Sequence, residues 1–177
     1  MTPLTYNEHL TSLMYRIVKK YLEIVEKVIN LLLQIIFGNT LFFNPIDAPY
    51  LSVVTPSSHD TSTIRGWWEE DPPKTQQFFN EVLAQKGEAP SECSPWINKA
   101  IMLQHLNAPA MWAIFQWQDF IGVDAALRRN DPQAERINDP SNATHYWRYR
   151  MHLSLESLLK EKSFNDQWAM DIKESGR

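Results

Sequence analysis

The sequence predicts a predominantly helical α/β fold with parallel strands, and two observations carry this prediction. First, residues 50–55 and 111–115 are short apolar runs rich in β-branched or aromatic side chains, and polar residues follow each run at once. Second, segments with helical periodicity come after both runs. This alternation is typical of parallel α/β proteins, in which active sites lie at the carboxyl ends of the strands.

The composition excludes several classes of protein. The chain has 177 residues, 44% of them hydrophobic and 21% charged, as in an ordinary globular domain. Its 17 basic and 21 acidic residues give a net charge of −4, which disfavours nucleic acid as a partner. The single Cys93 suits a reducing cytoplasm. The longest apolar stretch, Val28 to Phe37, is about half of a bilayer span, and the first residues do not resemble an export signal, so we expect no membrane partner.

Residues 1–37 form the first of two predicted segments, with one long amphipathic helix from Thr5 to Phe37. Apolar residues recur at alternating steps of four and three, and Gly38 is a natural helix stop. The apolar stripe is wider than a coiled-coil seam, which favours an ordinary core-facing helix. A dimerising coil, through which the chain would self-associate, is the alternative. The seam consists of Met14, Val18, Tyr21, Val25, Val28, Leu32 and Ile35.

The second predicted segment, residues 38–177, contains the two strands and most of the helices. A strand over residues 50–55 is bounded by prolines. Apolar spacing predicts a helix over residues 75–85, and another over residues 96–105 behind a serine–proline pair that supplies an N-cap and a first-turn proline.

The remainder of this segment contains a strand, a loop and a helix. We expect residues 111–115 to form a buried strand, although periodicity alone does not exclude a helix. Residues 128–144 are rich in Asp, Asn and Pro and read as an ordered loop. Residues 145–162 are predicted to be helical, and the apolar residues that indicate this are Trp147, Met151, Leu155 and Leu158.

Polar residues after the two strands form the candidate site. Residues 57–63 and 116–119 are expected on one rim, because the carboxyl ends of parallel strands meet there. Asp60 next to His59 is suited to hold a ligand at this rim, although an Asp in this place more commonly caps the next helix.

Two tryptophans follow the candidate site directly in the sequence. Trp67 and Trp68 offer faces on which a sugar ring or a base can stack, although paired tryptophans are more often core.

Three ordered motifs resemble the 4-alpha-glucanotransferases, also called amylomaltases or disproportionating enzymes. The resemblance covers about residues 37–177 and is greatest to the larger bacterial and plant cytosolic type. Residues 50–71 resemble the family's third catalytic region, residues 104–119 its final barrel strand, and residues 135–150 its C-terminal signature. The three strings are YLSVVTPSSHDTSTIRGWWEED, QHLNAPAMWAIFQWQD and ERINDP followed by HYWRYR.

The resemblance implies retaining transfer of α-1,4-glucan segments, from maltodextrins or glycogen, within a (β/α)8 TIM-type barrel. Asp60 matches a carboxylate that bonds two sugar hydroxyls and stabilises the cationic transition state. His59 matches a histidine that contacts the same sugar. Trp67 as a wall, Asp119 as a polar group on the rim and Asn138 are further candidate sugar contacts, each weighed against a structural role.

The chain departs from the family in two ways. Neither the nucleophile motif ending in Asp-His-Phe nor the acid/base motif Glu-Asp-Leu-Gly occurs in it. A whole barrel takes about 250 residues and eight strands. We therefore expect a C-terminal fragment of the barrel that is inactive alone and exposes apolar surface, with an N-terminal helix unlike the family.

Two other functions remain as alternatives. One is a catalytically dead barrel remnant that self-associates through its N-terminal helix. The other is a carbohydrate-binding module, which would need a preformed groove. No cofactor is implied, and the scattered histidines and the lone cysteine do not suggest a metal site.

Overall fold

The computed structural model describes Arg16, residues 18–20 and residues 41–177. The chain divides into two compact units, Met1–Phe43 and Asn44–Arg177. In the first unit the described residues Arg16 and 18–20 are helical, and the rest of the helix predicted from Thr5 to Phe37 lies outside the described residues. The division of the chain after residue 37 and the partner of that helix therefore stay predictions.

The second unit contains a two-stranded sheet. After a short 3-10 turn, η1 (Pro45–Asp47), strand β1 (Val53–Val54) pairs in parallel with β2 (Trp112–Ala113). Val53 lies opposite Trp112, and the Ile114 backbone N–H donates to the Val54 carbonyl at 2.9 Å. Both predicted strands are present in the predicted parallel arrangement, although each is shorter than its apolar run.

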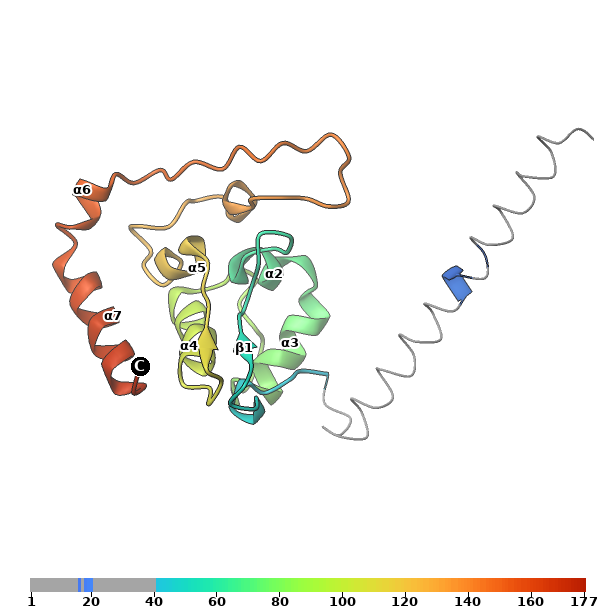
Figure 1. The fold of residues 1–177 in the computed structure, drawn as a ribbon, viewed down its shortest axis with the longest axis horizontal. Coiled ribbons are helices and arrows are strands. Elements are labelled where there is room, and N and C mark those ends of the chain that lie inside the picture. The colour runs from blue at the N-terminus through green and yellow to red at the C-terminus, as the bar shows by residue number, and fades with distance from the viewer. Residues whose placement is uncertain (1–15, 17, 21–40) are drawn as a thin grey trace, which may run out of the picture. The chain divides into compact units, whose positions relative to one another are not determined.

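Three helices connect β1 to β2 (Figure 1). They are α2 (Ile64–Glu70), α3 (Pro72–Glu81) and α4 (Pro95–Leu106). Helix α4 begins with Pro95 at its first position, as predicted, although the Ser94 side chain makes no capping hydrogen bond. Helix α3 begins three residues before the predicted start at 75, because the Asp71 side chain caps it by accepting from the Lys74 N–H at 3.2 Å.

An aromatic cluster joins these helices. Trp68 is buried and donates its indole N–H to the Pro90 carbonyl at 2.8 Å. Its ring meets Phe78 and Phe79 edge-on, with centroids 6.4 Å apart in both pairs. Burial of large aromatic rings in edge-to-face pairs stabilises the packing of α2 against α3.

The C-terminal third contains α5 (Trp117–Ile121), the 3-10 turn η2 (Pro132–Glu135), α6 (Leu155–Leu158) and α7 (Lys162–Glu174). The helix predicted over residues 145–162 is therefore wrong for most of its length. Residues 145–151 have no regular structure, and the long helix begins where the predicted one was to end.

Contacts with a distant loop explain the irregular segment. The Arg129 guanidinium donates to the Arg150 carbonyl at 2.6 Å, and the His152 ring nitrogen lies 2.8 Å from the Leu127 carbonyl. The His145 ring nitrogen lies 2.9 Å from the Ile137 carbonyl. These tertiary contacts outweigh the weak helix propensity of a run rich in aromatic residues.

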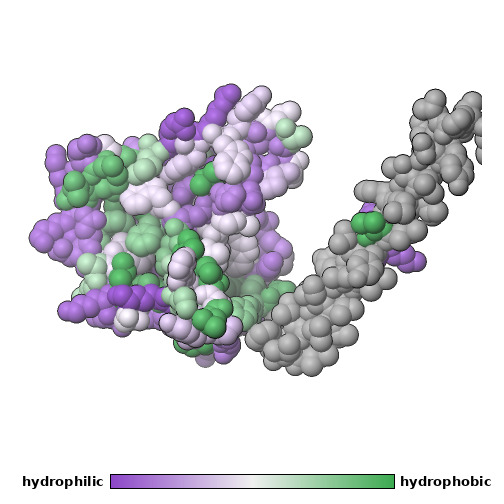
Figure 2. Space-filling model, viewed as in Figure 1, coloured by the Kyte–Doolittle hydropathy of each residue, from purple (hydrophilic) through white to green (hydrophobic). Residues whose placement is uncertain are grey.

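The two strands are also more exposed than predicted. Val54 is buried with Ala48, Ala108 and Ala110, whereas Val53, Trp112 and Ile114 are exposed. In the described residues this sheet has two strands, and the exposure of these three side chains shows that one of its faces has little to cover it. Figure 2 shows apolar residues at the surface of this unit among hydrophilic ones. No helix in the described ranges is long and apolar enough to cross a membrane.

Candidate functional site

A tight turn after β1 presents His59 and Asp60. The Thr61 N–H donates to the Ser58 carbonyl at 3.0 Å, and the Ser58 N–H donates back to the Thr61 hydroxyl at 2.8 Å. These reciprocal bonds leave the two residues between them at the tip. The side chains of His59 and Asp60 are each 52% exposed, and His59 Nε2 lies 3.1 Å from Asp60 Oδ2.

Asp60 does not cap the following helix. Thr63 occupies the N-cap of α2, and its hydroxyl accepts from the Gly66 N–H at 3.2 Å. The Asp60 carboxylate instead faces partly into solvent next to a histidine. Of the two roles considered for Asp60 from the sequence, the geometry excludes the helix cap, and the ligand contact stays a prediction.

Asn138 is brought to this turn from a loop 78 residues away. Its backbone N–H donates to the His59 carbonyl at 3.1 Å, and its side-chain amide donates to Asp60 Oδ1 at 2.7 Å. The loop that carries the ERINDP motif therefore contacts both predicted site residues, and Asn138 is bonded to Asp60.

Trp147 is a site neighbour that sequence reasoning missed. Its ring centroid lies 5.1 Å from that of His59, with the planes tilted by 52°, and its side chain is exposed. The sequence feature that could have indicated Trp147 is the aromatic run at residues 145–150, which we assigned to a predicted helix. An extended backbone there allows the indole to lie against the histidine instead.

Trp67, the wall predicted from the sequence, belongs to the aromatic cluster. It is half-buried, and its ring meets Phe78 with centroids 5.2 Å apart at 80° and Trp68 at 6.3 Å. These ring contacts are with α2 and α3, and the core alternative for this residue fits the structure.

The structure also corrects the position expected for Asp119. Its side chain has no exposed surface, so it lies beneath the rim and not on it. Its carboxylate accepts from the Ser57 hydroxyl and, at 2.8 Å, from the Ile64 N–H. Burial raises the pKa of Asp119 to about 6 despite these bonds.

The two strand ends nevertheless meet as predicted. The Gln116 amide donates to the Ser57 hydroxyl at 2.6 Å and to the Ser58 carbonyl at 2.9 Å, while Ser57 is bonded to Asp119. A hollow of about 310 Å³ opens beside this junction. It is lined by Val53, Thr55, Ser57, Ser58, His59, Ile114, Phe115, Gln116 and Ile137.

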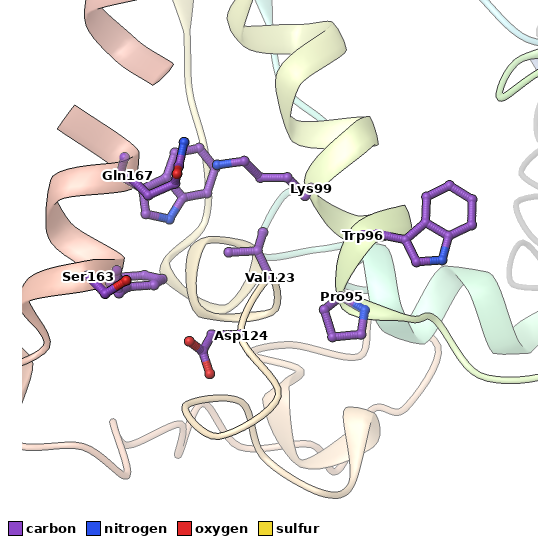
Figure 3. A pocket seen from close by; sticks show the side chains of 9 residues that line it. Pro95, Trp96, Lys99, Val123, Asp124, Ser163 and Gln167 are labelled. Atoms are coloured by element: carbon purple, nitrogen blue, oxygen red, sulfur yellow. The ribbon is translucent and has the colours of Figure 1, made fainter. Parts of the chain in front are cut away.

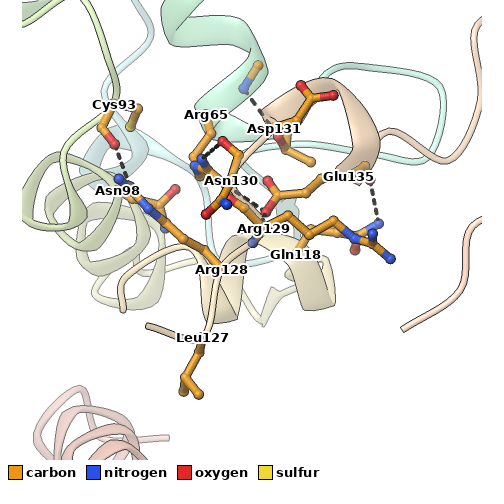
Figure 4. A network of polar contacts seen from close by, with 12 residues as sticks. Arg65, Cys93, Asn98, Gln118, Leu127, Arg128, Arg129, Asn130, Asp131 and Glu135 are labelled. Atoms are coloured by element: carbon orange, nitrogen blue, oxygen red, sulfur yellow. Dashed lines mark hydrogen bonds and ion pairs between the residues drawn. The ribbon is translucent and has the colours of Figure 1, made fainter. Parts of the chain in front are cut away.

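A buried polar network holds the loop that leads to Asn138 (Figure 4). Arg65 of α2 donates to Glu135 Oε1 at 2.6 Å and to the Arg129 carbonyl at 2.8 Å, and the Gln118 amide donates to the Glu135 carbonyl at 3.0 Å. Burial raises the pKa of Glu135, although the Arg65 charge opposes that rise. Nearby, the buried Cys93 accepts at its carbonyl from Arg128, and burial raises its thiol pKa to about 12.

A second hollow lies between α4 and α7. It measures about 400 Å³, and its lining includes Lys99, Asp124, Ser163 and Gln167. Trp96 contributes to one edge, but Figure 3 shows its indole directed away from the other lining side chains. Two further aromatic residues line this hollow: Phe164 is half-buried, and Trp168 is buried with the Lys99 ammonium over its ring.

Comparison with known proteins identifies the family. The 4-alpha-glucanotransferase family profile matches residues 13–156. The chain belongs to the 4-alpha-glucanotransferase family. It is 40% identical over 139 residues to the 4-alpha-glucanotransferase DPE2 of Oryza sativa subsp. japonica and 35% identical over 123 residues to the 4-alpha-glucanotransferase of Chlamydia pneumoniae.

The chain spans only a small part of these 4-alpha-glucanotransferases. The match covers 78% of this chain but 15% of the rice protein, and 65% of this chain but 22% of the chlamydial one. The match to the family begins at residue 13, inside the segment for which we predict a separate helix.

A solved structure supports the fold. The amylomaltase from Streptococcus agalactiae in complex with acarbose matches with a TM-score of 0.50 and 19% identity, over 72% of this chain and 22% of that chain. The mostly helical unit with its small parallel sheet thus resembles part of an amylomaltase. Among the described residues, no group of three or more His, Cys, Asp or Glu side chains is placed to hold a metal ion.

Proposed function

We propose that the His59–Asp60 turn binds a glucose unit of an α-1,4-glucan. The observation that carries the proposal is the half-exposed Asp60 carboxylate, held beside an imidazole at the carboxyl end of β1 and free of helix capping. Support comes from the relatives, which are named 4-alpha-glucanotransferases, and from the amylomaltase solved with acarbose.

The chemistry of the site suits a sugar. An ionised carboxylate accepts hydrogen bonds from neighbouring hydroxyls, and these bonds strengthen as positive charge develops on the sugar ring in an oxocarbenium-like transition state. Trp147 places an exposed indole next to His59, where the apolar face of a pyranose can stack. We therefore assign to Trp147 the wall that the sequence suggested for Trp67.

The chain supplies only part of a retaining transfer. Such a transfer needs a carboxylate nucleophile, which forms the glycosyl-enzyme bond as the glycosidic bond breaks, and a second carboxyl group that protonates the leaving oxygen. The family motifs that carry these two groups are missing from this sequence. We therefore propose that Asp60 stabilises the transition state when the remaining catalytic groups are present, and that the purified chain alone converts maltotriose to neither glucose nor longer maltodextrins.

Acarbose binding to the purified chain tests the sugar site. In a titration followed by ¹H–¹⁵N NMR we expect saturable shifts at His59 and Trp147. Asp60→Asn should weaken binding about 10-fold or more, because a charged hydrogen bond to the sugar is lost. The matched control is Asp47→Asn, an exposed carboxylate in η1. Equal affinity of the Asp60 variant and wild type, or no saturable binding at all, would overturn the proposal.

Self-association is a second candidate property, and the exposed apolar side chains of β1 and β2 favour it. Val53 and Trp112 are paired on adjacent strands and Ile114 directly follows β2, and a sheet with uncovered apolar side chains is a common site of association. The alternative function, a catalytically dead remnant that associates through its N-terminal helix, concerns residues outside the described part. A cytoplasmic location, expected from the single cysteine, stays a prediction.

A further inference from the structure

The loop of residues 136–139 makes two bonds to neighbouring residues of the site turn. The Asn138 backbone N–H donates to the His59 carbonyl at 3.1 Å, while its side-chain amide donates to Asp60 Oδ1 at 2.7 Å. One residue thus holds the main chain of the turn and the carboxylate that projects from it. The position of Asp60 therefore depends on the position of this loop.

Asn138 is itself held by Arg136. The Arg136 Nε–H donates to the Asn138 carbonyl at 2.9 Å. The terminal nitrogens of the same guanidinium lie 3.8 Å from Glu70 at the end of α2 and 3.8 Å from Asp139. Glu70 also accepts from the hydroxyl of Ser62, which lies two residues after Asp60. The guanidinium therefore connects the loop to the helix that follows the site turn.

These contacts restrict what the Asp60 carboxylate can do. Each oxygen accepts about two hydrogen bonds. Asn138 occupies one position on Oδ1, and His59 Nε2 lies beside Oδ2, so the plane of the carboxylate is held at both oxygens. The other lone pairs remain available in a defined direction. Such orientation before the substrate arrives is how a fixed charge stabilises a transition state without reorganisation.

We propose that Asn138 is a positioning residue for Asp60 and that Arg136 keeps Asn138 in place. The proposal deepens the sugar site and rests on it for its functional meaning. It assigns to Asn138 a different role from the direct sugar contact that the sequence suggested, because one N–H of its side-chain amide is bonded to the Asp60 carboxylate.

NMR of the ligand-free chain tests the geometry. Asp60→Asn replaces a charged acceptor by a neutral one, so the resonances of the Asn138 side-chain amide, which donates to this group, should shift clearly in that variant. The control resonance is that of the Asn107 side-chain amide, which donates to a backbone carbonyl and should keep its chemical shift in Asp60→Asn. If the chemical shift of the Asn138 amide is also unchanged in Asp60→Asn, the proposal is overturned.

Acarbose titration of the full chain tests the functional meaning. We expect Asn138→Ala to weaken binding about 5- to 10-fold and Arg136→Lys about 2- to 3-fold, with thermal unfolding close to that of wild type. Asn142→Ala, an exposed substitution in the following loop, should leave affinity unchanged.

The two measurements separate the possible failures. If wild type binds acarbose and Asn138→Ala binds equally well, the positioning role is overturned while the sugar site stands. If the chemical shift of the Asn138 amide changes in Asp60→Asn but wild type does not bind acarbose, the sugar site is overturned. The functional role of Asn138 is then overturned with it.

Discussion

The carboxylate of Asp119 accepts a hydrogen bond at 2.8 Å from the backbone N–H of Ile64, which is 55 residues away in the sequence. Ile64 is the first residue of α2, and Asp119 lies in the first turn of α5. A fully buried side chain therefore connects the helix that follows β2 to the helix that follows β1. The turn with His59 and Asp60 lies between β1 and this helix, so Asp119 supports the site from beneath.

The first prediction concerns the pH dependence of stability. Burial raises the pKa of Asp119 from its ordinary 3.8 to about 6, so the folded state binds this proton more tightly than the unfolded state does. The resulting stability is fully present below about pH 4 and is lost as the pH rises through about 6. A rise of this size corresponds to about 3 kcal/mol.

Asp119→Asn removes this titration. Urea unfolding of both proteins between pH 4 and pH 7 should show that wild type loses up to about 3 kcal/mol relative to the variant over this range. Parallel stability profiles of the two proteins would contradict the assignment.

The second prediction separates the cap of α2 from the site. Thr63→Ala removes the hydroxyl that accepts from the Gly66 N–H and should lower the free energy of unfolding by about 1 kcal/mol. Asp60→Asn should change it by less than about 0.5 kcal/mol, because the carboxylate is half-exposed and caps no helix. If the two effects are reversed in thermal or urea unfolding, Asp60 is the cap after all.

The third prediction concerns the buried pair of Arg65 and Glu135. Arg65→Met leaves the Glu135 carboxylate buried without its cation and should destabilise the protein by about 3–5 kcal/mol. The double variant Arg65→Met/Glu135→Met should recover about 2 kcal/mol or more. As a surface control, Lys162→Ala breaks an exposed pair and should leave the free energy of unfolding close to that of wild type. A double variant no more stable than Arg65→Met would argue against this account.

The fourth prediction concerns the uncovered sheet. Sedimentation equilibrium should give a mass above 20.7 kDa that rises with concentration. Ile114→Lys places a charge beside β2 and should weaken association about 10-fold or more. The control Leu159→Lys changes another exposed apolar residue, which lies outside the sheet. A monomer at all concentrations would rule out this surface as a contact.

Local sequence signals predicted the elements that position the site. Proline-bounded β-branched residues predicted β1, and a serine–proline pair predicted the start of α4. The meeting of the two strand ends followed from the parallel arrangement, and the bonds from Gln116 to Ser57 and Ser58 confirm it. These features depend on neighbours in the sequence or on one general rule of parallel sheets.

Features that depend on distant contacts were not predicted. Local spacing does not distinguish Trp67, which packs in the core, from Trp147, which lies against His59. Each tryptophan lies in a short run that mixes aromatic and polar residues. Asp119 is likewise a polar residue after a strand, and only the tertiary fold turns it inward to Ser57 and Ile64. The family resemblance suggested Asn138 as a sugar contact, but its bond to Asp60 crosses 78 residues and was not predicted.

The state of Cys93 makes it a natural reporter of local opening. In the folded protein the Cys93 thiol is buried, and burial raises its pKa to about 12. Little of the reactive thiolate is therefore present at neutral pH. A maleimide or disulfide reagent should therefore modify this chain only through transient exposure of the region around Cys93. The labelling rate then gives the frequency of that exposure without any engineered probe.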